Sequence, residues 1–384
     1  MKVHEYQAKE LLRRFGVEVP DNQGVADTGP GTRDAVERMG GKAALKAQVH
    51  TGGRGKAGGI RLASSPEEAE KLAGEMLGML LKTHQAPDGL RVDKLLVEEP
   101  IDIRQEYYFA AVPDRAMQRD TLIVSAKGGM DIEAVAAEDP GAITKVAVHP
   151  LEGLGDFQVR QALYDAGIDP AHVEKASLLL KRLYEAYVSL DASLVEINPV
   201  AVTGDGRILA ADAKIEIDDS ALFRHPDLAA VSEGSQEDPI EAEAKKEDIA
   251  YVRLDGEIGI ICNGAGLTMT TMDEVKRAGG SPANFLDVGG GAQAARVRKC
   301  LQLVLSDPHV KGILINIFGG ITRCDEVAGG ILDAISGISI GLPIVVRLAG
   351  TRAAEGAEIL SESSLTYAST MQEAAERIVA LAAT

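Results

Sequence analysis

Apolar and polar positions along the first half of the chain follow the periods of both helices and strands. In residues 4–15 the apolar side chains fall near one helical face and Gly16 supplies a stop, which predicts a helix. Residues 66–79 predict a second helix, with Ser64 or Ser65 as its N-cap and acidic residues in its first turn. Since helices and strands are both expected, this half is predicted to be a mixed α/β structure.

Short apolar runs between these helices predict strands. They cover residues 42–49, 95–97, 107–112 and 122–125, and a further helix is expected over 171–187. A hairpin follows, with strands 193–202 and 208–215 joined by the turn Gly204-Asp205-Gly206. Residues 51–59 are too rich in glycine for a regular element and are expected to form a loop.

The rhythm changes beyond about residue 255. Apolar strands alternate there with amphipathic helices, a pattern typical of a parallel sheet with helices on both faces. The predicted strands cover residues 258–262, 284–288, 313–317 and 344–348. A polar segment, 232–239, precedes this region, and we expect a boundary there between a first domain of residues 1–238 and a second of residues 239–384.

Composition excludes several classes of protein. The 384 residues carry 40 Lys and Arg against 58 Asp and Glu, a net charge of −18, which argues against a general nucleic-acid binder but leaves room for one basic pocket. No apolar run is long enough for a membrane helix, and the charged N-terminus lacks the core of a signal peptide. The three cysteines form no CxxC pair. We therefore expect a cytoplasmic protein without a disulfide framework or a cysteine-based zinc site.

Four predicted strands of the second domain end in small or polar residues, at 263–266, 289–291, 319–320 and 349–351. Ligands of open α/β sheets bind outside the carboxyl ends of the strands, where helix N-termini attract anions, so an anionic ligand is expected there. The alternative is that tight strand-to-helix turns use glycine without any ligand. Met269 stands at the third glycine position of a dinucleotide fingerprint, which argues against an NAD-type site.

The turn after residues 319–320 is expected to lead into a helix that begins around Thr322, with its free backbone N–H groups toward the crevice. Arg323 either adds positive charge there or is an ordinary surface residue. In the first domain, Lys46 lies on a predicted strand that leads into a loop with Arg54 and Lys56. Cations beside accessible backbone amides suit a polyphosphate, although this is not a Walker motif.

The predicted hairpin pairs oxygen-bearing side chains. If its turn centres on Asp205, Asn198 faces Asp212 and Glu196 faces Lys214 on one side of the sheet. A carboxylate opposite an amide oxygen suits Mg²⁺. Ordinary cross-strand polar pairs are the alternative, and a bulge at the proline after Asn198 would shift the register by one.

Two further glutamates, Glu98 and Glu106, are candidates for nucleotide contact. Glu98 ends an apolar strand, where backbone can meet a base and a carboxylate the ribose. A solvated strand end is the alternative.

The order of these motifs resembles one family, the β subunits of ADP-forming succinate–CoA ligases (succinyl-CoA synthetases), essentially from end to end. The segments that carry the resemblance are HEYQAKE (4–10), KAQVHTGGRGKAGG (46–59), EINP (196–199), ALFRHPD (221–227), NGAGL (263–267), PANFLDVGGG (282–291) and NIFGGITRC (316–324). The resemblance implies an ATP-grasp N-terminal domain followed by a flavodoxin-like CoA-ligase domain with a parallel sheet.

Roles carried over from the family fall on matching positions. The resemblance implies that nucleotide phosphates are held by Lys46, Gly53, Arg54 and Gly55, that the base and ribose are met by Glu98 and Glu106, and that Mg²⁺ is bound by Asn198 and Asp212. It implies that Asn263, Gly320, Ile321 and Thr322 line the site for the carboxylate substrate and phosphate. The nucleotide is expected to be ATP/ADP or GTP/GDP.

The resemblance also implies an incomplete enzyme. In this family the phosphohistidine and the CoA site belong to the α subunit, and none of the seven histidines here lies in a comparable glycine-flanked loop. The expected reaction converts succinate, CoA and ATP to succinyl-CoA, ADP and phosphate in the tricarboxylic acid cycle, within an α₂β₂ heterotetramer. Glu196 is the candidate catalytic residue that steadies the visiting imidazole.

Two other functions remain open at this point. A sister enzyme such as malate–CoA ligase would use the same chemistry on another dicarboxylate. A non-catalytic nucleotide-sensing or scaffold subunit would be expected to lack the metal pair or the phosphate-loop cations, and this chain has both.

Overall fold

The computed structural model describes residues 1–230, 238–289, 294–320, 323–336 and 340–383. The chain divides into two compact units, residues 1–236 and 237–384, and each is described by itself. Within the described ranges, no helix is both long enough and apolar enough to cross a membrane.

A four-stranded sheet opens the first unit. Its strand order is β1 (Asn22–Ala26), β6 (Leu95–Glu98), β2 (Ala43–Ala47), β3 (Ile60–Ala63), and α2 (Gly29–Arg38) and α3 (Pro66–Met76) cover one face. Side chains alternate along each strand, so Leu45 and Val97 pack toward these helices while Lys46 and Glu98 point to the opposite face. Ser65 caps α3 by accepting from the backbone N–H of Glu68. The hairpin β4 (Leu80–Thr83) and β5 (Ala86–Arg91) forms a separate small sheet.

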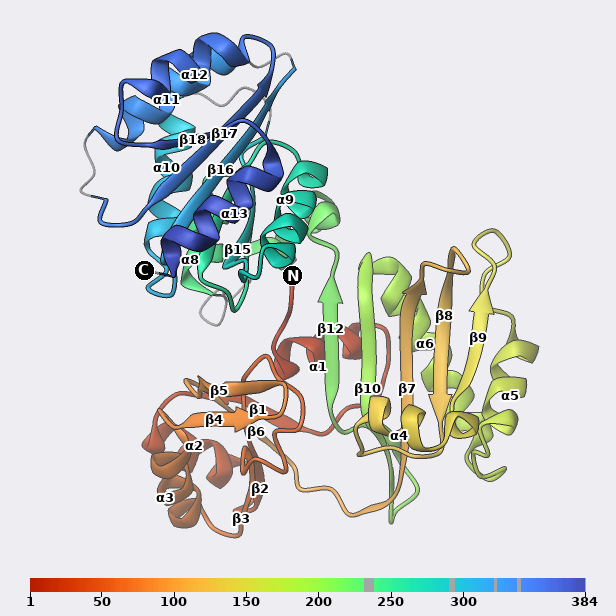
Figure 1. Ribbon diagram of the computed structural model, residues 1–384. Coiled ribbons are helices and arrows are strands. Elements are labelled where there is room, and N and C mark those ends of the chain that lie inside the picture. Colours follow the sequence, from red (N-terminus) through yellow and green to blue (C-terminus); the bar gives the residue numbers. More distant parts are fainter. Residues whose placement is uncertain (231–237, 290–293, 321–322, 337–339, 384) are drawn as a thin grey trace. The chain divides into compact units, whose positions relative to one another are not determined.

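A larger antiparallel sheet completes the first unit (Figure 1). Its order is β11 (Ile208–Ala210), β10 (Ala192–Thr203), β7 (Ile103–Asp114), β8 (Arg119–Ser125), β9 (Thr144–Val148), and β12 (Ala213–Ile217) also pairs with β10. The helices α1 (Glu5–Arg14), α5 (Asp156–Asp165) and α6 (Val173–Ser189) share its hydrophobic core. Shorter elements are α4 (Ile132–Glu138), η1 (Pro140–Ala142), η2 (Asp219–Arg224) and α7 (Pro226–Ala230).

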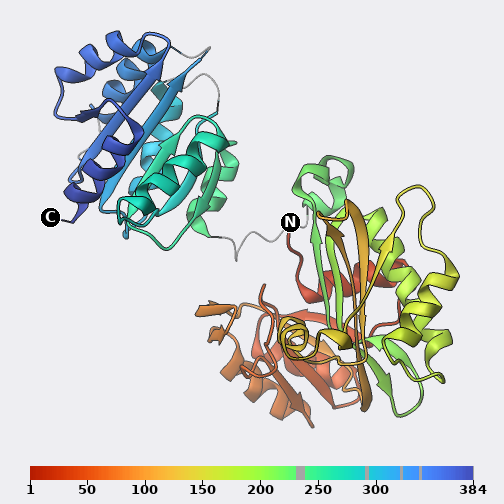
Figure 2. The ribbon, with the colours of Figure 1, turned by 45° about the vertical axis from the view of Figure 1, so that its right-hand side comes forward.

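The second unit has one six-stranded sheet between two helix layers (Figures 1 and 2). Its order is β13 (Ala250–Arg253), β15 (Asn284–Asp287), β14 (Ile258–Cys262), β16 (Gly312–Gly319), β17 (Ile344–Gly350), β18 (Thr366–Ala368). The helices α9 (Ala265–Arg277) and α13 (Met371–Ala382) cover one face, and α10 (Ala294–Leu305), α11 (Cys324–Ile335) and α12 (Ala353–Ser361) cover the other. The helix α8 (Pro239–Lys246) precedes β13. Without β13, the five parallel strands follow the flavodoxin-like order.

Several predicted elements need correction. The two edge strands, β13 (antiparallel) and β18 (parallel), were not predicted. The helix expected to begin around Thr322 begins at Cys324. The second hairpin strand is not continuous over 208–215, because Ala211 and Asp212 separate β11 from β12. The hairpin register is confirmed, since Glu196 pairs with Lys214 and the pairing of β11 follows the same register.

Gly350, at the end of β17, has φ +92°, and a Cβ there would lie 2.1 Å from the carbonyl oxygen of Gly319. Gly350→Ala is therefore expected to lower the free energy of unfolding by about 1–3 kcal/mol, measured by urea denaturation. The control is Gly329→Ala in α11, where an added Cβ meets nothing within 4 Å. That change is expected to be neutral or stabilising by up to about 1 kcal/mol. Equal losses in both variants would contradict the steric argument.

Candidate functional site

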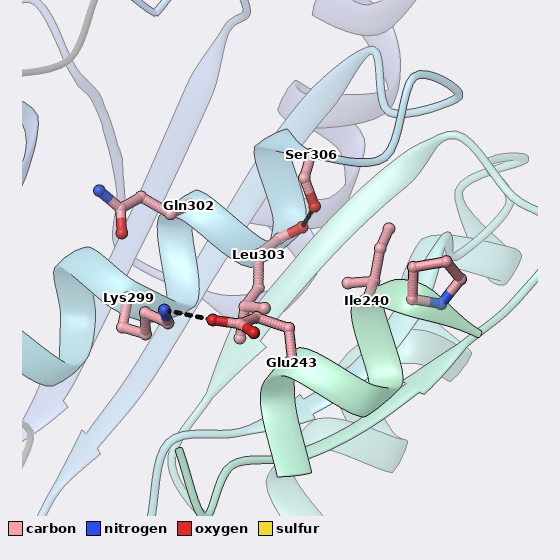
Figure 3. Close-up of a pocket in the computed structure, with 7 residues that line it drawn as sticks. Ile240, Glu243, Lys299, Gln302, Leu303 and Ser306 are labelled. Atoms are coloured by element: carbon pink, nitrogen blue, oxygen red, sulfur yellow. Dashed lines mark hydrogen bonds and ion pairs between the residues drawn. The ribbon is translucent and has the colours of Figure 1, made fainter. Parts of the chain in front are cut away.

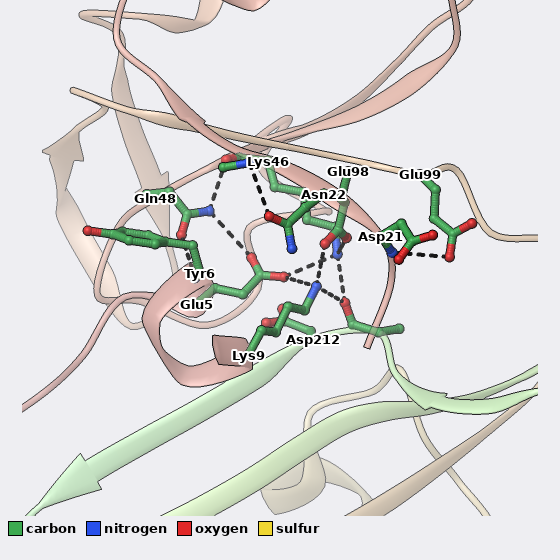
Figure 4. A network of polar contacts seen from close by, with 12 residues as sticks. Glu5, Tyr6, Lys9, Asp21, Asn22, Lys46, Gln48, Glu98, Glu99 and Asp212 are labelled. Carbon is green, nitrogen blue, oxygen red and sulfur yellow. Dashed lines mark hydrogen bonds and ion pairs between the residues drawn. The ribbon is translucent and has the colours of Figure 1, made fainter. Parts of the chain in front are cut away.

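Lys46 lies at the centre of a buried ion network in the first unit (Figure 4). Its Nζ lies 2.5 Å from Oε1 of Glu98 and 3.1 Å from Oε1 of Glu5, and it donates to the carbonyl oxygen of Ala211 at 2.7 Å. Burial alone would lower the pKa of Lys46, but Glu5, Glu98 and Asp212 outweigh it and raise that pKa. The lysine is therefore held charged in the interior, between the four-stranded sheet and the larger antiparallel sheet of the first unit.

Glu98 is not the solvated strand end that was the alternative for this residue. Its side chain is buried, with Oε1 at Lys46 and Oε2 accepting from Nζ of Lys9 at 2.7 Å. Lys9 lies on α1, one turn after Glu5, and also donates to the carbonyl oxygen of Ala211. Both oxygens of Glu98 are thus engaged by cations, which makes it first of all a counter-ion for the two lysines.

Arg54 joins this network from the glycine-rich loop. Its Nη1 donates to the carbonyl oxygen of Ala47 at 2.8 Å, and its Nη2 lies 2.7 Å from Oε2 of Glu5. The same Nη2 donates to both carboxylate oxygens of Asp212, at 2.8 and 2.7 Å. Burial alone would raise the pKa of Glu5, but the charges of Arg54, Lys46 and Lys9 outweigh it and hold that pKa well below its usual range. The network therefore pairs three cations with three carboxylates.

Gly53 and Gly55 flank Arg54 in an irregular loop and are both exposed. Gly53 has φ +73°, a conformation that favours glycine. Lys56 is exposed as well, so the loop has one buried cation, Arg54, and one open to solvent.

Asn198 and Asp212 lie opposite each other, as predicted from the hairpin. The backbone N–H of Asn198 donates to the carbonyl oxygen of Asp212 at 3.3 Å. The side chain of Asn198 is held from the other side, because Oδ1 accepts from the N–H of Gly129 at 2.8 Å and Nδ2 donates to the carbonyl oxygen of Met130 at 2.9 Å. The side chain of Asp212 is 31% exposed, so its carboxylate meets Arg54 on one side and solvent on the other.

The surroundings of this pair suit a hard cation. Burial raises the pKa of Glu196; Lys214 opposes that rise, while Asp212 and Glu133 add to it. One carboxylate, that of Asp212, and one amide oxygen, that of Asn198, are ligands of the kind that Mg²⁺ takes. Among the described residues, no three or more His, Cys, Asp and Glu side chains are grouped to hold a metal. The donors therefore fit a cation that keeps water or phosphate in its remaining positions.

Glu106 lies close to the same pair. Its backbone oxygen accepts from the N–H of Gly128 at 3.1 Å. A Cβ on Gly129, which has φ +68°, would lie 2.3 Å from Oε2 of Glu106. The turn at Gly128 and Gly129 therefore contacts both Glu106 and Asn198, so these two predicted residues meet at one turn.

Three residues of the ion network and of the surroundings of Glu196 were not predicted as site residues: Glu5, Lys9 and Glu133. Glu5 and Lys9 are four residues apart on α1, and that spacing of opposite charges was visible in the sequence. Their burial against β2 and β6 was not visible. Glu133 lies on α4, which was not predicted either.

Asn263 lies at the carboxyl end of β14, beside the end of β16, where the strand order reverses direction. Its Nδ2 donates to the carbonyl oxygen of Phe318, and its Oδ1 accepts from the N–H of Phe318, both at 2.8 Å. The carbonyl oxygen of Gly320 accepts from Oγ1 of Thr351 at 3.0 Å. The predicted residues Ile321 and Thr322, like Gly290 and Gly291, lie outside the described residues.

Arg323 supplies less charge to this edge than its sequence position suggested. Its guanidinium is paired with Asp325 and lies 3.3 Å from Glu326, so its charge is balanced locally.

A hollow elsewhere in the unit, between α8 and α10, holds the Glu243–Lys299 ion pair at 2.9 Å (Figure 3). It contains none of the predicted site residues.

Comparison with known proteins first defines the class. A model of the ATP-grasp domain matches residues 2–202, and a model of the CoA-ligase domain matches residues 261–381. The chain therefore has an ATP-grasp domain followed by a CoA-ligase domain, the domains of a CoA-ligase enzyme.

Individual relatives are more specific. The succinate–CoA ligase [ADP-forming] subunit beta of Nitratiruptor sp. is 50% identical to this chain, and the match covers 95% of this chain and 94% of the relative. The same subunit of Roseiflexus sp. is also 50% identical, and the match covers 99% of this chain and 98% of the relative. The chain belongs to the family of ADP-forming succinate–CoA ligase β subunits. Among solved structures, ATP citrate lyase from Methanothrix soehngenii, in complex with citrate and coenzyme A, has a TM-score of 0.73 at 20% identity and covers 100% of this chain and 99% of its own, a likeness of fold.

Proposed function

We propose that the first unit of this β subunit binds a magnesium nucleotide, ATP/ADP or GTP/GDP, and that catalysis requires an α subunit carrying the phosphohistidine and the CoA site. One observation carries the proposal: the cation Arg54, from the predicted phosphate loop, lies directly against Asp212, one of the two predicted metal ligands. The cation proposed to bind phosphate and a carboxylate proposed to bind the metal thus lie in one cluster. The assembly proposed is a cytoplasmic α₂β₂ heterotetramer of the tricarboxylic acid cycle.

The chain's residues divide the work as follows. Lys46, Arg54 and the glycines Gly53 and Gly55 are proposed to bind the phosphates, and Glu106 and Glu98 are proposed to contact the base and ribose. Asn198 and Asp212 would hold Mg²⁺, which when bound neutralises charge on the phosphates.

The proposed reaction has three steps, two transfers of the phosphoryl group and one of the succinyl group. A nitrogen of the α-subunit histidine attacks the γ-phosphorus; the N–P bond forms, the bond to the bridging oxygen breaks, and ADP leaves. An oxygen of the succinate carboxylate then takes the phosphoryl group and frees the imidazole, giving succinyl phosphate. The sulfur of CoA then attacks the carbonyl carbon of succinyl phosphate, the C–O bond to phosphate breaks, and the thiol proton leaves with the phosphate as succinyl-CoA forms.

The second unit receives succinate and phosphate at the carboxyl edge of its sheet. Asn263, Gly320, Ile321 and Thr322 are the residues proposed to contact them. Helix α9 begins at Ala265 and α11 at Cys324, just after strands β14 and β16, so their N-terminal dipoles favour an anion at this edge.

The central experiment incubates the purified chain with γ-labelled ATP, alone and with its α subunit, and then compares turnover with succinate and with malate. Label on the α-subunit histidine and preference for succinate are expected. Stable label on the β chain would contradict the scheme.

Glu196 is proposed to accept a hydrogen bond from the visiting imidazole and so to orient it for phosphoryl transfer. Glu196→Gln is expected to lower kcat by about ten- to a hundred-fold while the nucleotide Kd changes less than about two-fold, because the phosphates are held elsewhere. Steady-state kinetics and calorimetry give the two numbers. The matched control is Glu216→Gln on the same hairpin, whose carboxylate is paired with Lys214 at 3.0 Å and which should leave kcat unchanged. Equal effects of both changes on kcat would remove Glu196 from this role.

A further inference from the structure

The pairing of Arg54 with Asp212 bears on the order in which metal and nucleotide bind. A single nitrogen of Arg54 contacts both oxygens of the Asp212 carboxylate, at 2.8 and 2.7 Å. The guanidinium is held there from behind by Oε2 of Glu5 at 2.7 Å and by the carbonyl oxygen of Ala47 at 2.8 Å. Its side chain is only 6% exposed. The arginine is therefore fixed in this place by three partners.

We infer that Arg54 acts as an internal counter-cation for Asp212, and that a divalent metal joins Asp212 only together with the nucleotide. The inference rests on the proposed function, which makes Asp212 a metal ligand and Arg54 a phosphate ligand. A positive charge within about 3 Å of both carboxylate oxygens repels a dication approaching the exposed side of Asp212. Phosphate oxygens, when they arrive, offer Arg54 a bidentate anionic partner of equal quality.

Charge balance makes this exchange self-consistent. Glu5 and Ala47 keep the guanidinium of Arg54 within reach of the phosphates. Arg54 then exchanges the Asp212 carboxylate for a phosphate, and the metal that accompanies the phosphates takes the place of Arg54 at Asp212. Glu5 remains as the anion that positions both Arg54 and Lys46 throughout. No buried charge is left unpaired in either state, which avoids the cost of several kcal/mol attached to a lone buried ion.

The test measures how tightly Mn²⁺ binds to the full chain in the absence of nucleotide. Mn²⁺ is used because it takes the same oxygen ligands as Mg²⁺. Arg54→Gln removes the cation, so this variant is expected to bind Mn²⁺ at least about ten-fold more tightly than the wild type. The signal of free Mn²⁺ in electron paramagnetic resonance measures the binding. Arg54→Lys is the matched control, since it keeps a cation and should bind Mn²⁺ as weakly as the wild type. Equal Mn²⁺ affinity in all three proteins, or tighter binding by the wild type, would overturn the inference.

A second measurement needs no variant. Wild-type crystals soaked in MnCl₂ without nucleotide should show no anomalous peak at Asp212, and a peak there with the Arg54 pair intact would overturn the inference. A different result would contradict the proposed function, namely a wild type without metal-dependent affinity for ATP or ADP. Metal-dependent nucleotide binding together with equal Mn²⁺ affinity in wild type and Arg54→Gln would therefore reject the inference and leave the proposed function standing.

Discussion

Asp212→Asn is expected to lower ATP-dependent turnover of the enzyme reconstituted with its α subunit by about a thousand-fold or more. Asparagine keeps the shape of the side chain but removes the charge that binds the metal, and with it the neutralisation of the transferring phosphoryl group. The fold should survive, because Asp212 is partly exposed and Arg54 keeps Glu5 and the carbonyl oxygen of Ala47 as partners. Turnover assays and circular dichroism measure the two expectations.

The control for this change is Asp205→Asn, at the tip of the same hairpin. Asp205 is 63% exposed and contacts Thr203 and Arg207 within its own turn, so it touches none of the proposed ligands. Its turnover should equal that of the wild type. An Asp212→Asn enzyme that retained more than about a tenth of wild-type turnover would show that this carboxylate does not hold the catalytic metal.

The hairpin shows what the sequence alone can predict. The turn Gly204-Asp205-Gly206 sets the register, and the two-residue period of strands then decides which side chains share a face, so Glu196 was correctly placed opposite Lys214. The same local rules predicted four strands of the second unit, β14, β15, β16 and β17, because the glycine-rich turns that end them are local too. Both edge strands, β13 and β18, were missed, since four and three residues carry too little pattern to distinguish them from a loop.

The buried network shows what the sequence could not predict. The period of β2 places Lys46 on one face, but it does not say which residues lie opposite that face. The partners come from far along the chain: Glu5 lies 41 residues away and Ala211 lies 165 residues away. Only the packing of α1 and of the β10–β12 hairpin against the four-stranded sheet brings them together. Arg54 was likewise predicted as a cation for phosphate, whereas its present partners are two carboxylates.

Glu98→Gln tests which of two roles governs this glutamate. The carboxylate is the counter-ion of both Lys9 and Lys46, and its side chain is 1% exposed. Glutamine keeps the shape but leaves two buried lysines with one carboxylate fewer, so the free energy of unfolding should fall by about 3–5 kcal/mol, measured by urea denaturation. The neighbouring Glu99→Gln is the control. Glu99 is 25% exposed and paired with Arg207, so its loss should cost about 1 kcal/mol or less.

The same pair of variants separates the counter-ion role of Glu98 from the nucleotide contact implied by the family resemblance. If the carboxylate mainly holds the lysines, saturating nucleotide should restore part of the lost stability, because phosphates bring new negative charge to Lys46. A thermal melt with and without Mg–ADP measures this restoration, which should be larger for Glu98→Gln than for wild type or Glu99→Gln. If Glu98 mainly contacts the ribose, the opposite pattern is expected: unchanged stability of the free protein and a smaller shift on adding nucleotide. That result would show that the ion network tolerates the loss of one carboxylate, and that Lys9 and Lys46 are sufficiently neutralised by Glu5 alone.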